Sequence, residues 1–529
     1  MRNYFLMSLI FVAGAVKANN ISVSNVTLAG QNVSAGVNNA LNYTYIEFDL
    51  TWNNSWRTSS APNNWDAAWV FIKYRTTGSS TWTHVKLAPS GHNSSSTTPT
   101  TSYSVQVGLV NESVNHSATT NPAVGAFIYR SADGTGTFSA NDIRLKWFYR
   151  DNGVGDNDII DVEVYAIEMV YVPDGSFYVG NNASTSSNIN RPFYKIGSPH
   201  TNFDITSEAS ITATGSTGNA GWIAHPEWSS NNQNTVSADF PKGYKGFYCM
   251  KYETSQQQWV DFLNSLTASQ QANLPTAAYS RNGISSSSGV FSTTLPFVAM
   301  NSLNWADVAS FLDWAGLRVM TELEFEKACR GTSTPVTEEF AWGNTSYTSH
   351  ATTITNGGLT NEVSAASGAN TNLTVTTNPG SSPLRVGSFA TSSSSRTQSG
   401  ASFYGIMDMS GNVSEQVATM INYQATTTSY TGIHGNGELT SSGYADVSNW
   451  PGLVSGFISS AGIAASATAC RGGGWYNNGA FSAASVGKVA DRAYSQLSVP
   501  PTSSRTDVAN IDRGARGVHT KPITASETK

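Results

Sequence analysis

Two carboxylates bracket a short glycine-containing segment in the C-terminal half of the chain, Asp408-Met-Ser-Gly-Asn-Val-Ser-Glu415. Calcium in proteins takes about six to eight oxygen ligands, which come from carboxylates and from backbone carbonyls. The glycine lets the backbone turn so that carbonyl oxygens can point inward between the two acids. The pattern therefore indicates a loop able to hold Ca²⁺.

A second acidic group, formed by Asp156, Asp158 and Asp161, lies near the start of an expected strand. Spaced carboxylates of this kind are compatible with a calcium site. They are equally compatible with a solvated turn, so the two interpretations stay open.

Thiols and imidazoles are few and isolated. The three cysteines, Cys249, Cys329 and Cys470, allow at most one disulfide, and their separation does not indicate which pair would form it. Buried free thiols are the alternative, and a disulfide-dense scaffold is excluded. The eight histidines are scattered with no two at metal-ligand spacing, so we assign them no role.

The N-terminal region is predicted to be an all-β sandwich over residues 19–165. Short β-branched and aromatic runs alternate there with turn residues, as in antiparallel sandwiches. In the first run, Tyr43, Tyr45, Phe48 and Leu50 nearly alternate with polar residues, which favours a half-buried strand with these four inward. The expected strands are Tyr43–Trp52, Ala67–Tyr74, Trp82–Leu87, Tyr103–Leu109, Gly125–Tyr129, Ile143–Tyr149 and Ile159–Ile167.

Three amphipathic helices are expected among the strands of the remaining chain. The first is capped by Thr254 or Ser255, the second begins at Asn304, and the third begins at Thr321, whose Glu324 completes a capping box. Gly316 and Gly331 end the second and third helices. Long Ser/Thr/Asn/Gly-rich loops separate these elements, and such loops are typical of functional surfaces or of insertions.

The first 18 residues resemble a bacterial-type signal peptide. A basic Arg2 precedes a short apolar run, and Val16 and Ala18 occupy the two positions that a signal peptidase reads. The run is too short for a stop-transfer helix, and no later segment is apolar for long enough to be a transmembrane segment. We therefore expect a secreted protein at an extracellular or cell-surface location.

Composition narrows the range of partners. Charged residues make up 12% of the 529-residue chain and the formal net charge is -6. The chain therefore lacks the excess of positive charge that would attract the phosphate backbone of a nucleic acid. Aromatic residues make up 11%, which favours a folded chain rather than a disordered one.

Several ordered sequence blocks between residues 166 and 520 resemble the formylglycine-generating enzyme, or sulfatase-modifying factor, family. They are Met169-Val-Tyr-Val-Pro-Asp-Gly-Ser-Phe177, Gly246-Phe-Tyr-Cys-Met-Lys-Tyr-Glu-Thr254, Leu317-Arg-Val-Met-Thr-Glu-Leu-Glu-Phe-Glu-Lys-Ala-Cys-Arg-Gly331, Tyr404-Gly-Ile-Met-Asp-Met-Ser-Gly-Asn-Val-Ser-Glu415, Arg471-Gly-Gly-Gly-Trp475 and Arg513-Gly-Ala-Arg-Gly517. The resemblance implies an α+β chain whose residues 166–525 form a C-type-lectin-like domain with long loops, preceded by the β-sandwich.

The resemblance also defines what catalysis would need. Family enzymes bind copper through two cysteines placed shortly after the Arg-Gly-Gly block, and here the stretch from Trp475 to Tyr494 has none. A single thiol at Cys470 cannot supply paired soft ligands for Cu(I). We therefore expect no copper and no catalytic residues.

Calcium is the cofactor that the resemblance supports. It implies a structural Ca²⁺ on the positions matching Asp408, Gly411, Val413 and Glu415. It also points to a second site in the loop near Asn356 and Gly357.

The remaining signature residues are interpreted as structural. Arg318, Glu322, Arg471 and Arg516 are expected to form buried ion pairs that hold loops together. Trp342 and Trp475 are expected in the core. The chain departs from the family at Ser414, where an aromatic residue is usual, which predicts a differently packed groove.

The favoured function is a non-catalytic surface protein that uses a calcium-stabilised scaffold for recognition or for assembly into an extracellular structure such as a filament. Its partners would be other extracellular proteins or further copies of itself. The first strand-like segment, Ile21–Leu28, could pair with a neighbour's sheet or begin its own. The alternatives are a sulfatase-modifying-type oxidoreductase with an altered metal site and a carbohydrate-binding protein.

Overall fold

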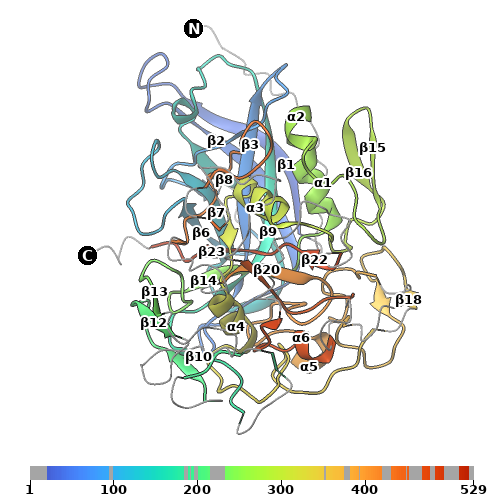
Figure 1. Ribbon diagram of the computed structural model, residues 1–529. Coiled ribbons are helices and arrows are strands. Elements are labelled where there is room, and N and C mark those ends of the chain that lie inside the picture. Colours follow the sequence, from blue (N-terminus) through green and yellow to red (C-terminus); the bar gives the residue numbers. More distant parts are fainter. Residues whose placement is uncertain are drawn as a thin grey trace.

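The computed structural model describes residues 21–94, 99–183, 189–190, 192–195, 201–214, 233–350, 353–373, 382–391, 393–419, 430–447, 450–451, 468–476, 483–493 and 511–523 (Figure 1). The predicted signal peptide, residues 1–18, lies outside them. The chain is mostly β, with few and short helices.

The N-terminal region is β-rich, as predicted, with one short 3₁₀ turn, η1 (Tyr149–Asn152), among its described residues. Its strands are β1 (Ser22–Asn32), β2 (Tyr43–Arg57), β3 (Asp66–Thr76), β4 (Thr83–His84), β5 (Asn93–Ser94), β6 (Tyr103–Leu109), β7 (Ala123–Arg130), β8 (Gly134–Trp147) and β9 (Ile160–Val172). The predicted strand Trp82–Leu87 is reduced to the two residues of β4.

The first apolar residues of β2 face the opposite side of the strand from the one expected. Ile46, Phe48, Leu50 and Trp52 are buried, whereas Tyr43 and Tyr45 lie on the outer face. An aromatic ring on that face is stabilised by a neighbouring cation, because the Lys146 Nζ lies 4.0 Å from the centre of the Tyr43 ring. The two tyrosines were therefore misassigned because aromatic residues suit both faces of a strand.

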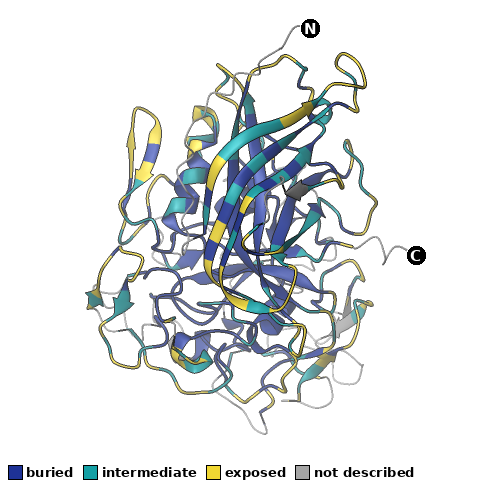
Figure 2. Ribbon diagram, turned by 180° about the vertical axis from the view of Figure 1, so that it is seen from behind, coloured by how far each residue is buried: buried dark blue, intermediate teal, exposed yellow. Residues whose placement is uncertain are grey.

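Two sheets enclose the N-terminal core. A four-stranded sheet has the order β1-β2-β8-β5, and a longer sheet has the order β17-β23-β14-β9-β3-β7-β6. Buried side chains from both sheets, among them Trp52, Ile72, Ile128 and Trp147, form one cluster between them. Figure 2 shows buried residues alternating with exposed ones along the strands of the four-stranded sheet, whose outer face is open.

β3 and β9 are buried on both faces. Along β3, Ala68, Val70 and Ile72 enter the N-terminal cluster, while Trp69 and Phe71 enter a second cluster on the opposite face. That second cluster contains the apolar sides of α1 (Gln256–Asn264) and α3 (Trp305–Trp314). The four-stranded sheet, the long sheet and these helices thus form successive layers (Figure 1).

The long sheet continues from the N-terminal strands into the C-terminal part. β9 pairs with β3 from Ile160 to Val170 and with β14 (Phe247–Met250) from Met169 to Val172. β23 (Gly517–Thr520) and β17 (Arg318–Val319) then extend the sheet. The expected domain boundary between residues 165 and 166 therefore falls inside a strand.

The three predicted helices are confirmed, and their caps explain where they begin. Ser255 caps α1, Asn304 caps α3, and Thr321 caps α4 (Glu322–Arg330). Each cap forms a full capping box with the residue three positions later, which satisfies otherwise unpaired N–H groups of the first turn.

The remaining elements are short and join the long loops. They are β10 (Phe177–Val179), β11 (Phe203–Ile205), β12 (Ile211–Thr214), β13 (Gln233–Val236), α2 (Ala268–Gln271), β15 (Ile284–Ser287), β16 (Val290–Thr293), β18 (Ile354–Thr355), β19 (Val363–Ser364), α5 (Arg396–Ser399), β20 (Ser414–Ala418), β21 (Thr468–Arg471), α6 (Ala483–Val486) and β22 (Arg513–Gly514). β20 lies between β21 and β22 in a three-stranded sheet. None of the helices in the described part combines the length and apolar character needed to cross a bilayer.

A buried lysine ties the two parts of the chain together. The Lys251 Nζ, just after β14, lies 3.0 Å from Glu168 Oε2 on β9 and 3.6 Å from Asp66 Oδ2 on β3. Asp66 also accepts hydrogen bonds from Trp52 Nε1 at 2.8 Å and Ser55 Oγ at 2.9 Å. Burial raises the pKa of Glu168 to about 7, although the Lys251 charge opposes that shift.

We predict that Lys251→Ala lowers the free energy of unfolding by about 3–5 kcal/mol, because it leaves two buried carboxylates without their cation. Urea denaturation monitored by tryptophan fluorescence would measure the loss. Lys521→Ala is the matched control, since its partner Asp174 lies 3.2 Å away in an exposed pair, and such pairs contribute at most about 1 kcal/mol. Equal, small losses in both variants would contradict the prediction.

Candidate functional site

The site begins with α4, whose capping box fixes the first turn and aims a row of acidic side chains inward. Glu322 and Glu326 are one helical turn apart and both are fully buried, as is Arg330 one turn further on. Charged residues are buried this deeply only when they are paired.

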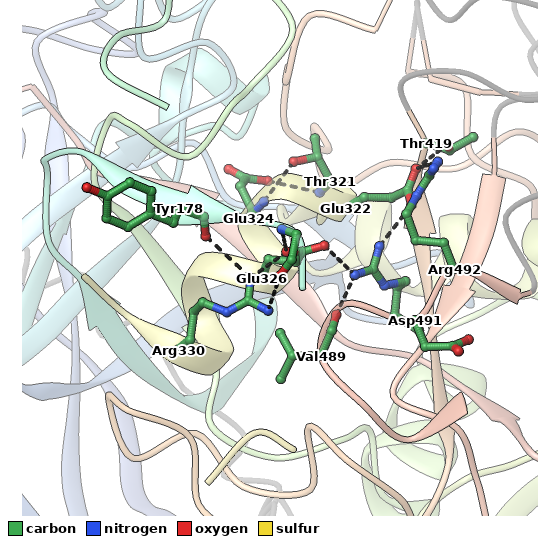
Figure 3. A network of polar contacts seen from close by, with 12 residues as sticks. Tyr178, Thr321, Glu322, Glu324, Glu326, Arg330, Thr419, Val489, Asp491 and Arg492 are labelled. Atoms are coloured by element: carbon green, nitrogen blue, oxygen red, sulfur yellow. Dashed lines mark hydrogen bonds and ion pairs between the residues drawn. The ribbon is translucent and has the colours of Figure 1, made fainter. Parts of the chain in front are cut away.

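Glu322 and Arg471, both expected in buried ion pairs, pair with each other. Arg471, at the end of β21, places Nη1 2.9 Å from Glu322 Oε2 and Nη2 2.8 Å from Glu326 Oε1. Arg492 Nε lies 2.7 Å from the same Glu322 oxygen, and Thr419 donates its hydroxyl to the other oxygen. Figure 3 shows Thr419 and Arg492 reaching Glu322 of α4 from separate chain segments.

The network extends past Arg330, which pairs with Glu326 and, at 2.7 Å, with Glu339. Burial alone would raise the pKa of Glu322, but Arg492, Arg471 and the Thr419 hydroxyl hold it below its ordinary value. The carboxylate therefore stays ionised and the network serves to join loops to a helix.

Two further arginines behave as expected. Arg318 Nη2 lies 2.5 Å from Glu324 Oε1, and Arg516 Nε lies 3.0 Å from Glu415 Oε1. Trp342 and Trp475 are both buried within apolar clusters, as predicted. Ser414 is buried on β20, and its hydroxyl donates to the Asp512 carbonyl at 3.4 Å.

Residues Asp408 to Val413 form a tight loop before β20, and Glu415 is the second residue of that strand. Asp408 and Asn412 adopt left-handed backbone angles, with φ of 58° and 66°, and Gly411 has φ of 108°. Asp408 Oδ2 accepts a hydrogen bond of 2.5 Å from the Gly387 N–H, and Gly411 N–H donates to the Gly472 carbonyl at 2.9 Å.

Besides Asp408 and Glu415, the carboxylate of Glu253 holds this loop by hydrogen bonds. Glu253 was not singled out from the sequence. Its Oε1 accepts the Val413 N–H at 2.8 Å and its Oε2 accepts the Asn412 side-chain amide at 2.5 Å. Glu253 lies within the Gly246–Thr254 block that carries the family resemblance, and this was the available signal. Burial raises its pKa, and the neighbouring Asp408 charge adds to that rise.

The loop carries an oxygen without a hydrogen-bond partner. Glu415 Oε2 is buried and unpaired, and a Cβ built on Gly472 would lie 2.5 Å from it and 3.0 Å from the Met409 carbonyl oxygen. Burial raises the pKa of Glu415 to about 7 and also raises the pKa of Asp408. Glu415 Oε1 is paired with Arg516, so the unpartnered Oε2 is the oxygen of Glu415 that could bind a hard cation such as Ca²⁺.

Side chains alone would not complete such a site. Across the described ranges, no group of three His, Cys, Asp or Glu side chains is arranged to hold a metal ion. An ion at this loop would therefore depend on backbone carbonyls in addition to Asp408 and Glu415, in keeping with calcium chemistry.

The other candidate metal ligands lie at two other places in the fold. Asn356 and Gly357 lie on an exposed turn, and the nearby Glu362 is paired with Arg281 at 2.5 Å. Asp156 accepts the Asn38 N–H at 2.6 Å, and Asp158, in the same turn, accepts the Gly155 N–H at 2.8 Å. Asp161, on β9, pairs with Arg75 at 2.9 Å through Oδ2, and its buried Oδ1 has no hydrogen-bond partner.

All three cysteines are buried free thiols. Of the two interpretations left open, this structure supports thiols that act as small apolar residues. Burial raises the pKa of Cys249 to about 12 and raises the pKa values of Cys329 and Cys470.

A pocket of about 340 Å³ lies where the N-terminal part meets the C-terminal part. Glu112 lines it from the β6–β7 connection, and Arg318, Glu324 and Thr520 line it from the other side. Glu112 Oε1 accepts the Leu109 N–H at 2.7 Å and lies 4.0 Å from His519 Nε2. Burial raises the pKa of Glu112 to about 8 and lowers that of His519 to about 3.

Short helices, irregular loops and buried arginine–carboxylate pairs characterise this mostly β chain, whose loops are held by internal charges. The chain belongs to the family of the Sulfatase-modifying factor enzyme 1-like domain, which it matches over residues 161–496. None of the curated proteins compared with the chain was similar to it.

Glu112 gives a pH-dependent prediction. Its raised pKa means that the folded state binds a proton that the unfolded state releases between about pH 4.5 and 8, so stability falls as pH rises through this window. Glu112→Gln should therefore gain stability relative to wild type by at least about 1 kcal/mol between pH 5 and 8, since one pKa unit corresponds to about 1.4 kcal/mol.

Urea denaturation at a series of pH values would measure this difference, and contributions from other groups cancel in the comparison. Asp239→Asn, which changes an exposed carboxylate on the same pocket wall, is the control and should show no such trend. A pH-independent difference for Glu112→Gln would contradict the burial argument.

Proposed function

We propose that this protein is a non-catalytic member of its family. The observation that carries the proposal is the state of its cysteines: all three are single, buried thiols, and the segment after the Arg471 block has no cysteine up to Tyr494. Copper in this family is bound by a cysteine pair in that segment. Cu(I) favours soft ligands such as paired thiolates, and burial raises the pKa of the existing single thiols.

The buried charge network supports the same conclusion. Glu322 and Glu326 are paired with Arg471 and Arg492 in a buried network. Charges buried this deeply are expected to be paired, so the network has a structural explanation that needs no substrate. The family fold is here stabilised as a scaffold.

A structural calcium ion is part of the proposal. Asp408 and Glu415 would hold it, together with backbone carbonyls at Gly411 and Val413. Bound Ca²⁺ would supply positive charge to the buried carboxylates and fix the loop before β20. The unpaired Glu415 Oε2 supports this assignment.

The scaffold would serve recognition or assembly outside the cell. An exported chain with few charges and long polar loops suits an extracellular surface role. The N-terminal part, which we interpret as a β-sandwich, shares a sheet with the family domain and so presents it on a rigid base.

The catalytic question can be tested directly. Purified protein incubated with copper, oxygen and a cysteine-containing peptide should form no aldehyde detectable by mass spectrometry, and elemental analysis should find no stoichiometric copper. Cys470→Ala should behave identically, because that thiol is not a ligand. Copper bound one-to-one in wild type and lost in Cys470→Ala would overturn the proposal.

Calcium should raise the melting temperature, because a ligand that binds only the folded state stabilises it by about 2.7 kcal/mol at 100 times its Kd. Chelation should reverse the shift in differential scanning calorimetry. Asp408→Asn should abolish the calcium-induced shift, whereas Asp158→Asn, at an exposed turn, should retain it. An equal shift in both variants would place the ion elsewhere, and no shift in wild type would remove calcium from the proposal.

A further inference from the structure

β6 is the last strand at one end of the long sheet, and its strand partner among the described residues is β7. Their register is continuous from Tyr103 opposite Arg130 to Gly108 opposite Gly125. An edge strand presents a row of backbone N–H and C=O groups that can pair with another chain.

The other ends of the four-stranded sheet and of the long sheet are blunted. β1 has two register irregularities against β2, and Asn25 and Gly30 there adopt left-handed angles of 54° and 61°. β5 and β17, at the remaining ends of these two sheets, are two residues long. Bulges and short strands are the usual protection against edge pairing. The structure thus gives no support to pairing through the first strand, which belongs to its own sheet.

β6 is less protected, because its register irregularity lies at its C-terminal end, between Gly108 and Leu109. Its sequence, Tyr-Ser-Val-Gln-Val-Gly-Leu, contains no charged residue and no proline. Tyr103, Val105 and Val107 pack against the N-terminal core but remain partly exposed. The core is therefore incompletely covered along this edge.

A groove of about 740 Å³ runs beside the edge. β6 forms one side, and Pro89, Gly91, His92 and Pro99 contribute the other, with Ile523 at its margin. The groove offers apolar side chains and backbone groups, which is the combination that recognises an added strand.

We propose that β6 pairs antiparallel with β6 of a second copy of this chain. A two-fold axis at Gln106 would place Val105 opposite Val107 of the second copy, so that the apolar rows of both strands lie on the same face. The strand is uncharged, so the two copies do not repel, and each supplies the partner strand that the other lacks. The inference rests on the assembly role proposed above and names its partner.

Introducing a charge at Gln106 tests this arrangement, because the two-fold axis places Gln106 of one copy opposite Gln106 of the other. Gln106→Lys or Gln106→Glu alone should raise the Kd of the dimer on the order of tenfold, since like charges directly opposite one another destabilise a strand pair. An equimolar mixture of the two variants should restore dimer formation. Sedimentation equilibrium of the full chain over a wide concentration range would give each Kd.

Gln31→Lys is the matched control. Gln31 on β1 and Gln106 on β6 each donate one side-chain hydrogen bond of 3.0 Å to a backbone carbonyl, those of Asp156 and Pro522. Gln31→Lys should leave the dimer unchanged. Hydrogen exchange of wild type should show protection of the Tyr103–Leu109 amides that rises with protein concentration, which requires no variant to fold.

Several outcomes would overturn the inference. They are a monomeric wild type at every concentration, a dimer unaffected by Gln106→Lys, and a variant mixture that stays monomeric. Copper loading and the calcium-induced shift do not depend on this edge, so their results would distinguish failure of the proposed function from failure of the β6 contact.

Discussion

The pairing of β3 with β9 is the constraint on which the rest of the structure depends. Both strands are buried on both faces, so most of their apolar side chains enter one of the two cores on either side of the sheet. Trp69 shows the connection most clearly, because its ring packs in the C-terminal cluster and its Nε1 donates to the Ala315 carbonyl, just beyond α3, at 2.7 Å. A change in the register of these strands would exchange the residues of the two cores.

This constraint explains why the site can be built from loops. Irregular segments leave backbone and side-chain polar groups that water cannot reach. Here arginine–carboxylate networks satisfy many of them, and the α4 capping box fixes the helix that anchors the largest network. Such pairs add little net stability compared with apolar packing, but removing one partner is costly, so they favour one loop arrangement over others.

The parts of the fold that could be predicted from the sequence are those whose determinants lie close together in the chain. Helix caps and most strands could be located because their determinants lie within a few residues, as at Ser255 and Asn304. The outward position of Tyr43 and Tyr45 and the shared sheet could not, because they depend on long-range pairing. In the site, the ion pairs of Glu322 and Arg516 followed from the family resemblance. Glu253 was missed since its contacts at Asn412 and Val413 lie about 160 residues away in sequence.

The position of β9 also bears on how this chain could have arisen. The family match begins at residue 161, yet the strand that contains this residue forms its main ladder with β3, which lies outside the match. The start of the family match therefore does not coincide with a boundary between separately folded units. An ancestral family domain joined to a separate β-unit would have had to merge their sheets, after which neither piece could be exchanged by recombination without rebuilding the apolar face of the other.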